Sequence, residues 1–242
     1  MKKALQLIMA LFVVAGCSKL DMITGEIADG IGVGLSSNGV TVMCKDLPIG
    51  AKFYSVKLEK EFEVVDNDLL RQRVSEGADL SCLCTSNVTD MYNLFEAELL
   101  TFDGFEHYLF SPWNKEPRFI IQDDITSWDV SNVTDASFLF ATQKAFNQDI
   151  SLWNTESLEN MTEMFAIAEV FNQDISNWDT SNVSIMSGTF RRAYEFNQPI
   201  SKWDVSDVND MELMFFSSTS FNQPIDKWDV SSVTSMDRMF YQ

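Results

Sequence analysis

Apolar residues recur through the second half of the chain with a fixed spacing of 25 residues. The repeated motif is Phe-Asn-Gln-(Asp/Pro)-Ile-x-x-Trp-Asp. Its tryptophans are Trp128, Trp153, Trp178, Trp203 and Trp228, and the isoleucines in step with them include Ile150, Ile175, Ile200 and Ile225. A fixed period of about 20–50 residues is typical of stacked repeats, so the pattern predicts a repeat solenoid over residues 85–242.

A second apolar segment, Val-x-x-Met-x-x-x-Phe, alternates with the first and ends at Phe165, Phe190 and Phe215 in successive coils. In residues 161–168 the apolar positions have the i, i+3, i+4, i+7 spacing of a helix face. Each coil is therefore expected to contain short parallel strands and one short helical turn. We expect the Trp, Ile and Phe residues to form the structural core, because one coil cannot bury its apolar face alone.

Residues 40–84 have a different pattern and are predicted to form a small α+β N-terminal cap. Alternating apolar residues predict a strand at 40–44 and a hairpin at 53–58 and 62–65. Asp66, Asn67 and Asp68 offer an N-cap for a helix that Gly77 would end. Such a cap would cover the apolar end of the first coil.

The N-terminus is predicted to be a targeting segment. Lys2 and Lys3 precede an apolar run at residues 4–15, as in a signal peptide. The sequence Val-Ala-Gly-Cys that ends at Cys17 resembles the lipobox of bacterial lipoproteins. This resemblance implies removal of residues 1–16 and a lipid anchor on Cys17, since several acyl chains hold a protein stably at a membrane. The alternatives are an ordinary signal peptide cut after Ala15 or Gly16, or an unprocessed helix.

Residues 17–39 are rich in Gly and Ser, which predicts a flexible tether between the lipid and the folded part. The alternative is that residues 23–35 pack as an irregular leader. Ser18, and not an aspartate, follows Cys17. In a bacterium with two membranes this favours the outer membrane, so we expect a surface-exposed protein whose contact with a membrane is its lipid anchor.

Three further cysteines are Cys44, Cys82 and Cys84. An exported protein can keep a disulfide. We predict a Cys44–Cys84 bond that links the cap to the first coil, with Cys82 as the alternative partner of Cys44. Three free thiols or a metal site would also account for these cysteines, but three cysteines and the distant His107 do not have a zinc-site spacing. No metal and no cofactor are therefore expected.

Composition narrows the function. A formal net charge of −19 argues against nucleic-acid binding, which needs Lys and Arg. The chain has one His and lacks the motifs of nucleophilic, phosphate-binding or zinc-dependent catalysis. We therefore predict that the protein is not an enzyme. A glycosidase-like pair of carboxylates is the remaining enzymatic alternative, and repeated acidic residues are better explained as a solvated face.

Two polar columns accompany the repeat. An amide column is predicted to bond to the backbone and to itself, as asparagine ladders do; it consists of Asn147, Asn172, Asn197 and Asn222. A carboxylate column is predicted to cap turns, with calcium binding as the alternative; it consists of Asp129, Asp179, Asp204 and Asp229. The Trp column has a carbohydrate-binding alternative, but its fixed spacing with Ile favours the core.

An insert of about 20 residues, near 96–116, interrupts the first coil. It contains several aromatic residues. Insertions into repeats often contribute to a binding face. The alternative is that these aromatic side chains pack over the cap.

The full repeat, Phe-Asn-Gln-Asp-Ile-Ser-x-Trp-Asp-(Val/Thr)-Ser-Asn-Val-Thr-x-Met-x-x-Met-Phe, resembles that of the BspA-like bacterial surface proteins. These form a divergent leucine-rich-repeat family that is abundant on lipoproteins. The resemblance covers residues 85–240 and is weakest at Ala136, Phe138 and residues 154–158. It implies a leucine-rich-repeat-like solenoid without catalytic residues.

The same resemblance implies protein binding or adhesion, with host or bacterial surface proteins as partners. The alternative is a carbohydrate-binding surface module, and a surface hydrolase is less favoured. The last residues, 240–242, stop within a coil, which suggests a truncated product or an array that ends by dimerisation.

Overall fold

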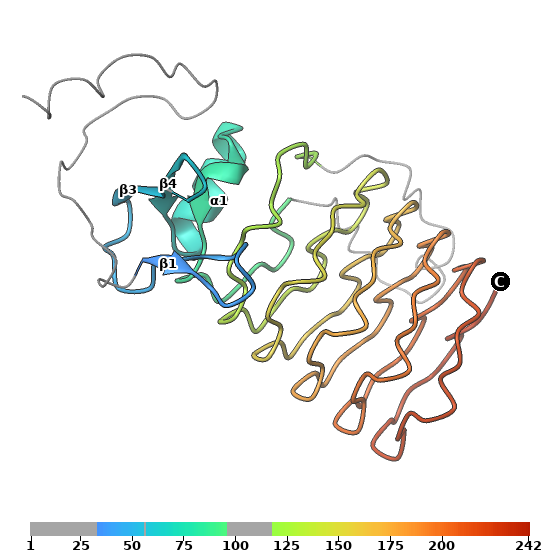
Figure 1. Ribbon diagram of the computed structural model, residues 1–242. Coiled ribbons are helices and arrows are strands. Elements are labelled where there is room, and N and C mark those ends of the chain that lie inside the picture. Colours follow the sequence, from blue (N-terminus) through green and yellow to red (C-terminus); the bar gives the residue numbers. More distant parts are fainter. Residues whose placement is uncertain (1–32, 56, 96–117) are drawn as a thin grey trace, which may run out of the picture.

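The computed structural model describes residues 33–55, 57–95 and 118–242 (Figure 1). The predicted signal peptide (residues 1–16), the lipidation residue Cys17, most of the predicted tether and the insert near 96–116 lie outside the described residues. A small cap comes first along the chain. A row of coils follows, and successive coils lie side by side (Figure 1).

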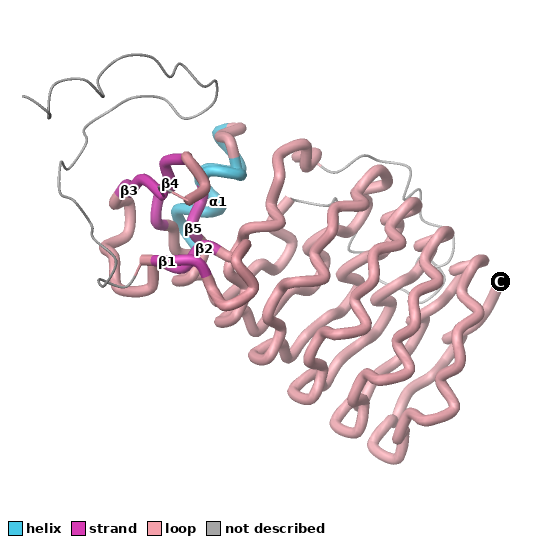
Figure 2. Tube along the Cα trace, in the orientation of Figure 1, coloured by secondary structure: helices cyan, strands magenta, loops and turns pink. Residues whose placement is uncertain are grey.

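The cap contains two small sheets (Figure 2). Strand β1 (Gly34–Leu35) pairs antiparallel with β2 (Val42–Met43). The other sheet has the order β3-β4-β5, from β3 (Lys52–Ser55), β4 (Lys60–Val64) and β5 (Leu83–Cys84). Strands β3 and β4 form an antiparallel hairpin, whereas β5 runs parallel to β4. The parallel pairing is possible because helix α1 (Asn67–Glu76) and the 3-10 turn η1 (Leu80–Cys82) connect the two strands.

Helix α1 is present where the capping residues predicted it. The Asp66 side chain accepts a hydrogen bond from Leu69 N, and Gly77 adopts the left-handed conformation that ends the helix, with φ 67°. Leu70 and Val74 are buried and join the apolar cluster of the coils. The helix therefore covers the first coil.

The predicted tether extends too far. Residues 34–39 belong to the folded cap, because β1 pairs with β2 across a turn at Asn38 and Gly39. Asn38 Oδ1 accepts hydrogen bonds from Val40 N and Thr41 N, and Gly39 has φ 75°. An Asn-Gly pair favours this kind of turn, and it is the sequence feature that the tether interpretation overlooked.

Backbone hydrogen bonds join each coil to the next. For example, Met161 N, Glu163 N and Phe165 N donate to carbonyl oxygens of the following coil at 3.0, 2.8 and 2.9 Å. Isolated parallel bridges mark the same ladder and connect Asp90, Asp135, Asn160, Ile185, Asp210 and Ser235 in sequence. These three amides all point toward the C-terminal end of the row, so their peptide dipoles add along the row.

The short helical turn predicted for each coil is not present in residues 118–242, all of which the structure describes. Successive β-turns replace it, with hydrogen bonds from Met164 N to Met161 O and from Ala166 N to Glu163 O. Glu163 and Ile167 have φ values of 48° and 60°. Alternate amides bond to the next coil and are not available to a helix, although the turns reproduce a helical spacing of apolar side chains.

Aromatic columns fill the interior of the row. Phe190 lies with its ring centroid 5.6 Å from both Phe165 and Phe215, and these rings are nearly parallel. The five tryptophans of the repeat are at most 8% exposed. Trp178 Nε1 donates to Ile150 O at 3.1 Å, and this bond recurs in the next two coils. Ile150, Ile175 and Ile200 are fully buried, whereas Ile225 is only partly buried.

The amide column forms the predicted ladder. Asn147 Oδ1 accepts from Asn172 N at 3.0 Å and from Gln173 Nε2 at 3.0 Å. The same pair of bonds recurs at Asn172 and Asn197. The prediction that these amides bind backbone groups and one another is therefore confirmed.

Candidate functional site

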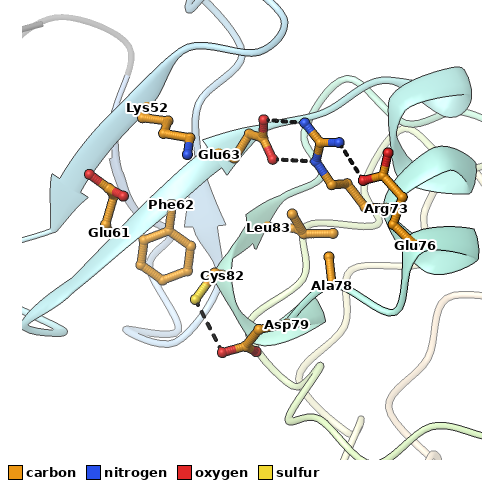
Figure 3. Close-up of a pocket in the computed structure, with 10 residues that line it drawn as sticks. All are labelled: Lys52, Glu61, Phe62, Glu63, Arg73, Glu76, Ala78, Asp79, Cys82 and Leu83. Atoms are coloured by element: carbon orange, nitrogen blue, oxygen red, sulfur yellow. Dashed lines mark hydrogen bonds and ion pairs between the residues drawn. The ribbon is translucent and has the colours of Figure 1, made fainter. Parts of the chain in front are cut away.

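A hollow of about 340 Å³ lies in the cap beside β4 and α1 (Figure 3). Its volume is at the lower end of the range of about 300–1,000 Å³ that is usual for ligand pockets. Charged side chains line it, but the principal ones bind each other. Arg73 makes two hydrogen bonds to Glu63, at 2.7 and 2.8 Å, and a third to Glu76 at 2.7 Å.

These contacts stabilise the charged forms of all three residues. The bond to Arg73 lowers the pKa of Glu63, and Glu63 raises the pKa of Arg73 above its ordinary value. The pKa of Glu76 is also lowered, first by its bond from Gln72 and then by Arg73. Groups held in this way are poor proton donors or acceptors near neutral pH, so the cap hollow lacks a general acid or base among these residues.

The described cysteines are all oxidised. Cys44 and Cys84 form a disulfide with a Cα–Cα distance of 6.3 Å. None of the described cysteines is a free thiol, which rules out the interpretation as three free thiols. Among the described residues, no group of His, Cys, Asp or Glu side chains has an arrangement that could hold a metal ion.

The carboxylate column caps turns. Asp179 Oδ1 accepts hydrogen bonds from Ser181 N and Ser181 Oγ at 3.0 and 2.7 Å, and Asp204 binds Ser206 in the same way. These bonds lower the pKa values of both aspartates. Asp129 differs, because it is buried and accepts from Ser86 Oγ in the first coil. The side chains predicted to cap turns do so, and their oxygens are occupied within the chain.

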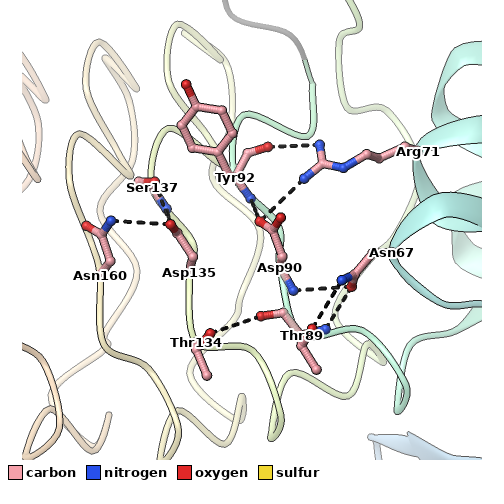
Figure 4. A network of polar contacts seen from close by, with 9 residues as sticks. All are labelled: Asn67, Arg71, Thr89, Asp90, Tyr92, Thr134, Asp135, Ser137 and Asn160. Carbon is pink, nitrogen blue, oxygen red and sulfur yellow. Dashed lines mark hydrogen bonds and ion pairs between the residues drawn. The ribbon is translucent and has the colours of Figure 1, made fainter.

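Beside the bridge ladder, the residue after each methionine position changes from one coil to the next. We call this set the varying strip; it consists of Tyr92, Ser137, Thr162, Ser187, Glu212 and Asp237. The ladder residues hold it in place, since Asp135 Oδ1 accepts from Ser137 N and Asn160 Oδ1 accepts from Thr162 N. Figure 4 shows this network and its link to α1, where Arg71 contacts Asp90 at 3.4 Å.

A groove of about 200 Å³, the coil groove, lies along the varying strip. Its lining residues come from successive coils and are Phe138, Thr162, Glu163, Ser187, Glu212, Leu213 and Arg238. Phe138 and Leu213 supply apolar surface, and Tyr92 packs edge-on against the Phe138 ring at 5.9 Å. The groove therefore combines an aromatic end with a charged end.

Gly188 accounts for the unusual course of Glu163. A Cβ at Gly188 would lie only 2.8 Å from Glu163 Cγ, so glycine makes room for this side chain. Glu163 turns inward and binds Arg191, with Oε2 2.7 Å from Nη2. Both side chains are almost fully buried, at 6% and 1% exposed. The carboxylate of Glu163 is therefore neutralised within the protein.

The Glu212 carboxyl lacks such compensation. Burial, followed by the negative charges of Asp210 and Asp237, raises its pKa, and Arg238 lowers it by less. Arg238 lies 3.7 Å from Asp237. The charged end of the coil groove thus has a net negative potential.

Sequence reasoning placed the tryptophans, isoleucines and phenylalanines in the core, and the structure buries nearly all of them. It missed the coil groove and the buried Glu163–Arg191 pair. The available signals were Gly188, which is the only glycine in residues 118–242, and Arg191, where neighbouring coils have Ala166 and Phe216. Because the buried tryptophans present no exposed ring face, they offer no platform for a sugar.

Within the described residues, no helix has the length and apolar character needed to cross a membrane. No curated protein and no solved structure matches the chain. A family model described as "Mycoplasma protein of unknown function, DUF285" matches residues 107–200 and again residues 174–242. Because these matches together cover more than half of the sequence, the protein belongs to the DUF285 family.

Proposed function

We propose that this protein is a non-enzymatic module that recognises other proteins, acting as an adhesin at a bacterial surface. One observation carries the proposal: recurring positions are used up in the core and the backbone ladders, whereas the varying strip changes from each coil to the next. A repeated scaffold with variable exposed positions suits recognition, because exposed residues can change without loss of the core. The described residues offer an extended face and a small groove, and not a deep cleft.

The architecture proposed for the coils is a leucine-rich-repeat-like solenoid. The parallel bridges and the stacked aromatic columns support this class. The BspA-like resemblance of the repeat supports a surface role, and the lipobox-like sequence at Cys17 supports lipid anchoring.

A binding assay against immobilised, purified matrix and serum proteins tests the proposal, with a glycan array run in parallel. The expected result is saturable binding to at least one protein that weakens when Tyr92 and Glu212 are replaced together by Ala and Gln. Binding to glycans alone would instead assign a carbohydrate-binding module. Turnover of any substrate would assign an enzyme.

Membrane fractionation of Cys17→Ser tests the anchor. The wild type is expected in the membrane fraction, and the variant in the soluble fraction. If the variant stays with the membrane, Cys17 is not the anchor, although protein recognition would be unaffected by that result.

A further inference from the structure

We propose that the coil groove is an anchor site for a single arginine side chain of a protein partner. The inference rests on the proposed function and specifies the chemistry of one contact. At about 200 Å³ the groove is smaller than the roughly 300–1,000 Å³ of pockets that enclose small molecules. It therefore has room for one long side chain and not for a whole metabolite.

The walls of the groove match the two parts of an arginine side chain. Phe138 and Leu213 provide apolar surface for the aliphatic stem. The Phe138 ring also offers a π-face, and planar guanidinium groups stack on such faces more readily than ammonium groups do. This contact favours arginine over lysine.

The charges of the groove favour a cation. Glu163 is already paired with Arg191 at 2.7 Å, so it does not contribute a free negative charge. Glu212 remains, with Asp210 and Asp237 nearby and one cation, Arg238, beside Asp237. Glu212 is partly exposed, and its two carboxylate oxygens can accept hydrogen bonds from a fork of N–H groups. A buried arginine is also a frequent energetic centre of protein interfaces.

The groove arises where the repeat departs from its pattern. Gly188 lets Glu163 turn inward, whereas the equivalent residue of the next coil, Leu213, remains at the groove. Glu163, Gly188 and Leu213 all have positive φ, so the backbone is the same and the side chains alone create the difference in shape and charge. Such a departure is where specificity can enter a repeated scaffold.

The test uses the full chain and butylguanidinium as the probe, with butylurea as its uncharged analogue. NMR signals of the Leu213 methyl groups report occupancy. We expect saturable shifts with butylguanidinium, in the millimolar range, and at least fivefold weaker apparent affinity for butylurea. Glu212→Gln should weaken butylguanidinium binding at least fivefold, and Phe138→Leu should weaken it at least twofold.

Glu195→Gln is the matched control, since Glu195 is exposed, lies away from the groove lining and its replacement removes the same charge. It should change affinity by less than twofold, and thermal unfolding of each variant verifies that it is folded. Equal binding of both probes, no saturation, or equal effects of the two Gln variants would overturn the inference. Saturable shifts with chitotriose instead of butylguanidinium would also overturn it, by assigning the groove to a carbohydrate. In each case a protein partner found in the binding assay would still support the proposed function.

Discussion

The cap and the coils reach a buried core by different means. In the cap each stabilising contact occurs once: the disulfide between Cys44 and Cys84, the three bonds of Arg73, and the bond from Asn38 Nδ2 to Leu152 O. In the coils one set of contacts is copied every 25 residues, as in the Trp178 and Trp203 indole bonds. The cap is therefore fixed by particular residues, whereas the coils are fixed by columns.

This difference separates stability from specificity. A column is strong because each member packs on both neighbours, so a change in one coil affects the next. A single contact in the cap affects its own surroundings. Exposed positions between the columns are constrained by neither, and in the coils they supply the varying strip.

The largest expected effect is the truncation of a column aromatic. Phe190 is fully buried between Phe165 and Phe215, so Phe190→Ala should reduce the free energy of unfolding by about 3–5 kcal/mol. Combined with Phe215→Ala, the loss should be non-additive by about 0.5–3 kcal/mol. Combined with Phe62→Ala in the cap, it should add within about 0.5 kcal/mol. Urea unfolding measures all of these, and additivity in both pairs would contradict the column account.

The two arginine networks should differ in the same direction. Arg191→Ala leaves Glu163 buried without its partner, and the expected loss is about 3–5 kcal/mol. Arg73→Ala, in a more exposed network, should lose only about 1 kcal/mol. The double variant Glu163→Leu with Arg191→Phe copies Leu213 and Phe216 of the next coil and should recover most of the lost stability. Urea unfolding again gives the values; equal losses for the two Ala variants would show that burial is not decisive.

Removal of the disulfide should affect the cap first. The bond closes a loop with a sequence separation of 40, and its loss through Cys44→Ala with Cys84→Ala should reduce stability by about 2–4 kcal/mol. Hydrogen exchange by mass spectrometry should show faster exchange in β3–β5, with protection in residues 146–215 retained. Equal loss of protection in both regions would mean that the cap and the coils unfold as one unit.

The smallest effect concerns acid. Bonds from serines lower the pKa values of Asp179, Asp204 and Asp229 in the folded protein, so their contribution to stability is present above the unfolded pKa and is lost as pH falls. Replacing all three by Asn keeps an oxygen acceptor, as Asn154 shows by accepting from Glu156 N. The loss of thermal stability between about pH 5 and pH 3 should therefore become shallower than in the wild type. An unchanged pH profile would mean that these bonds do not contribute.

Much of the coil interior could be predicted, because burial in a column imposes the same residue type at each repeat. The positions of Trp178 and Phe190 follow directly from the period. The β-turns could not be predicted from the apolar spacing alone, since Met161 and Met164 have the same spacing in a helix and in a turn. The coil groove depends on one departure, Gly188, whose effect requires knowledge of how Glu163 and Arg191 lie in neighbouring coils.

The cap was less predictable for a related reason. The Asp66 and Gly77 caps of α1 are local signals and could be found. The early start of the folded cap depends on contacts distant in sequence, such as the bond from Asn38 to Leu152 O, which have no repeat to reveal them.

The central claim is that recurring positions build the row of coils and varying positions determine binding. Deleting residues 196–220 tests it most directly, because it removes one full period and joins Glu195 to Phe221, the equivalent of Phe196. Urea unfolding of this variant should show one cooperative transition, with a smaller m value because less surface becomes exposed. Deleting residues 196–207, about half a period, should abolish that transition. A full-period deletion that fails to fold, or a half-period deletion that unfolds as cooperatively as the full-period one, would contradict the account.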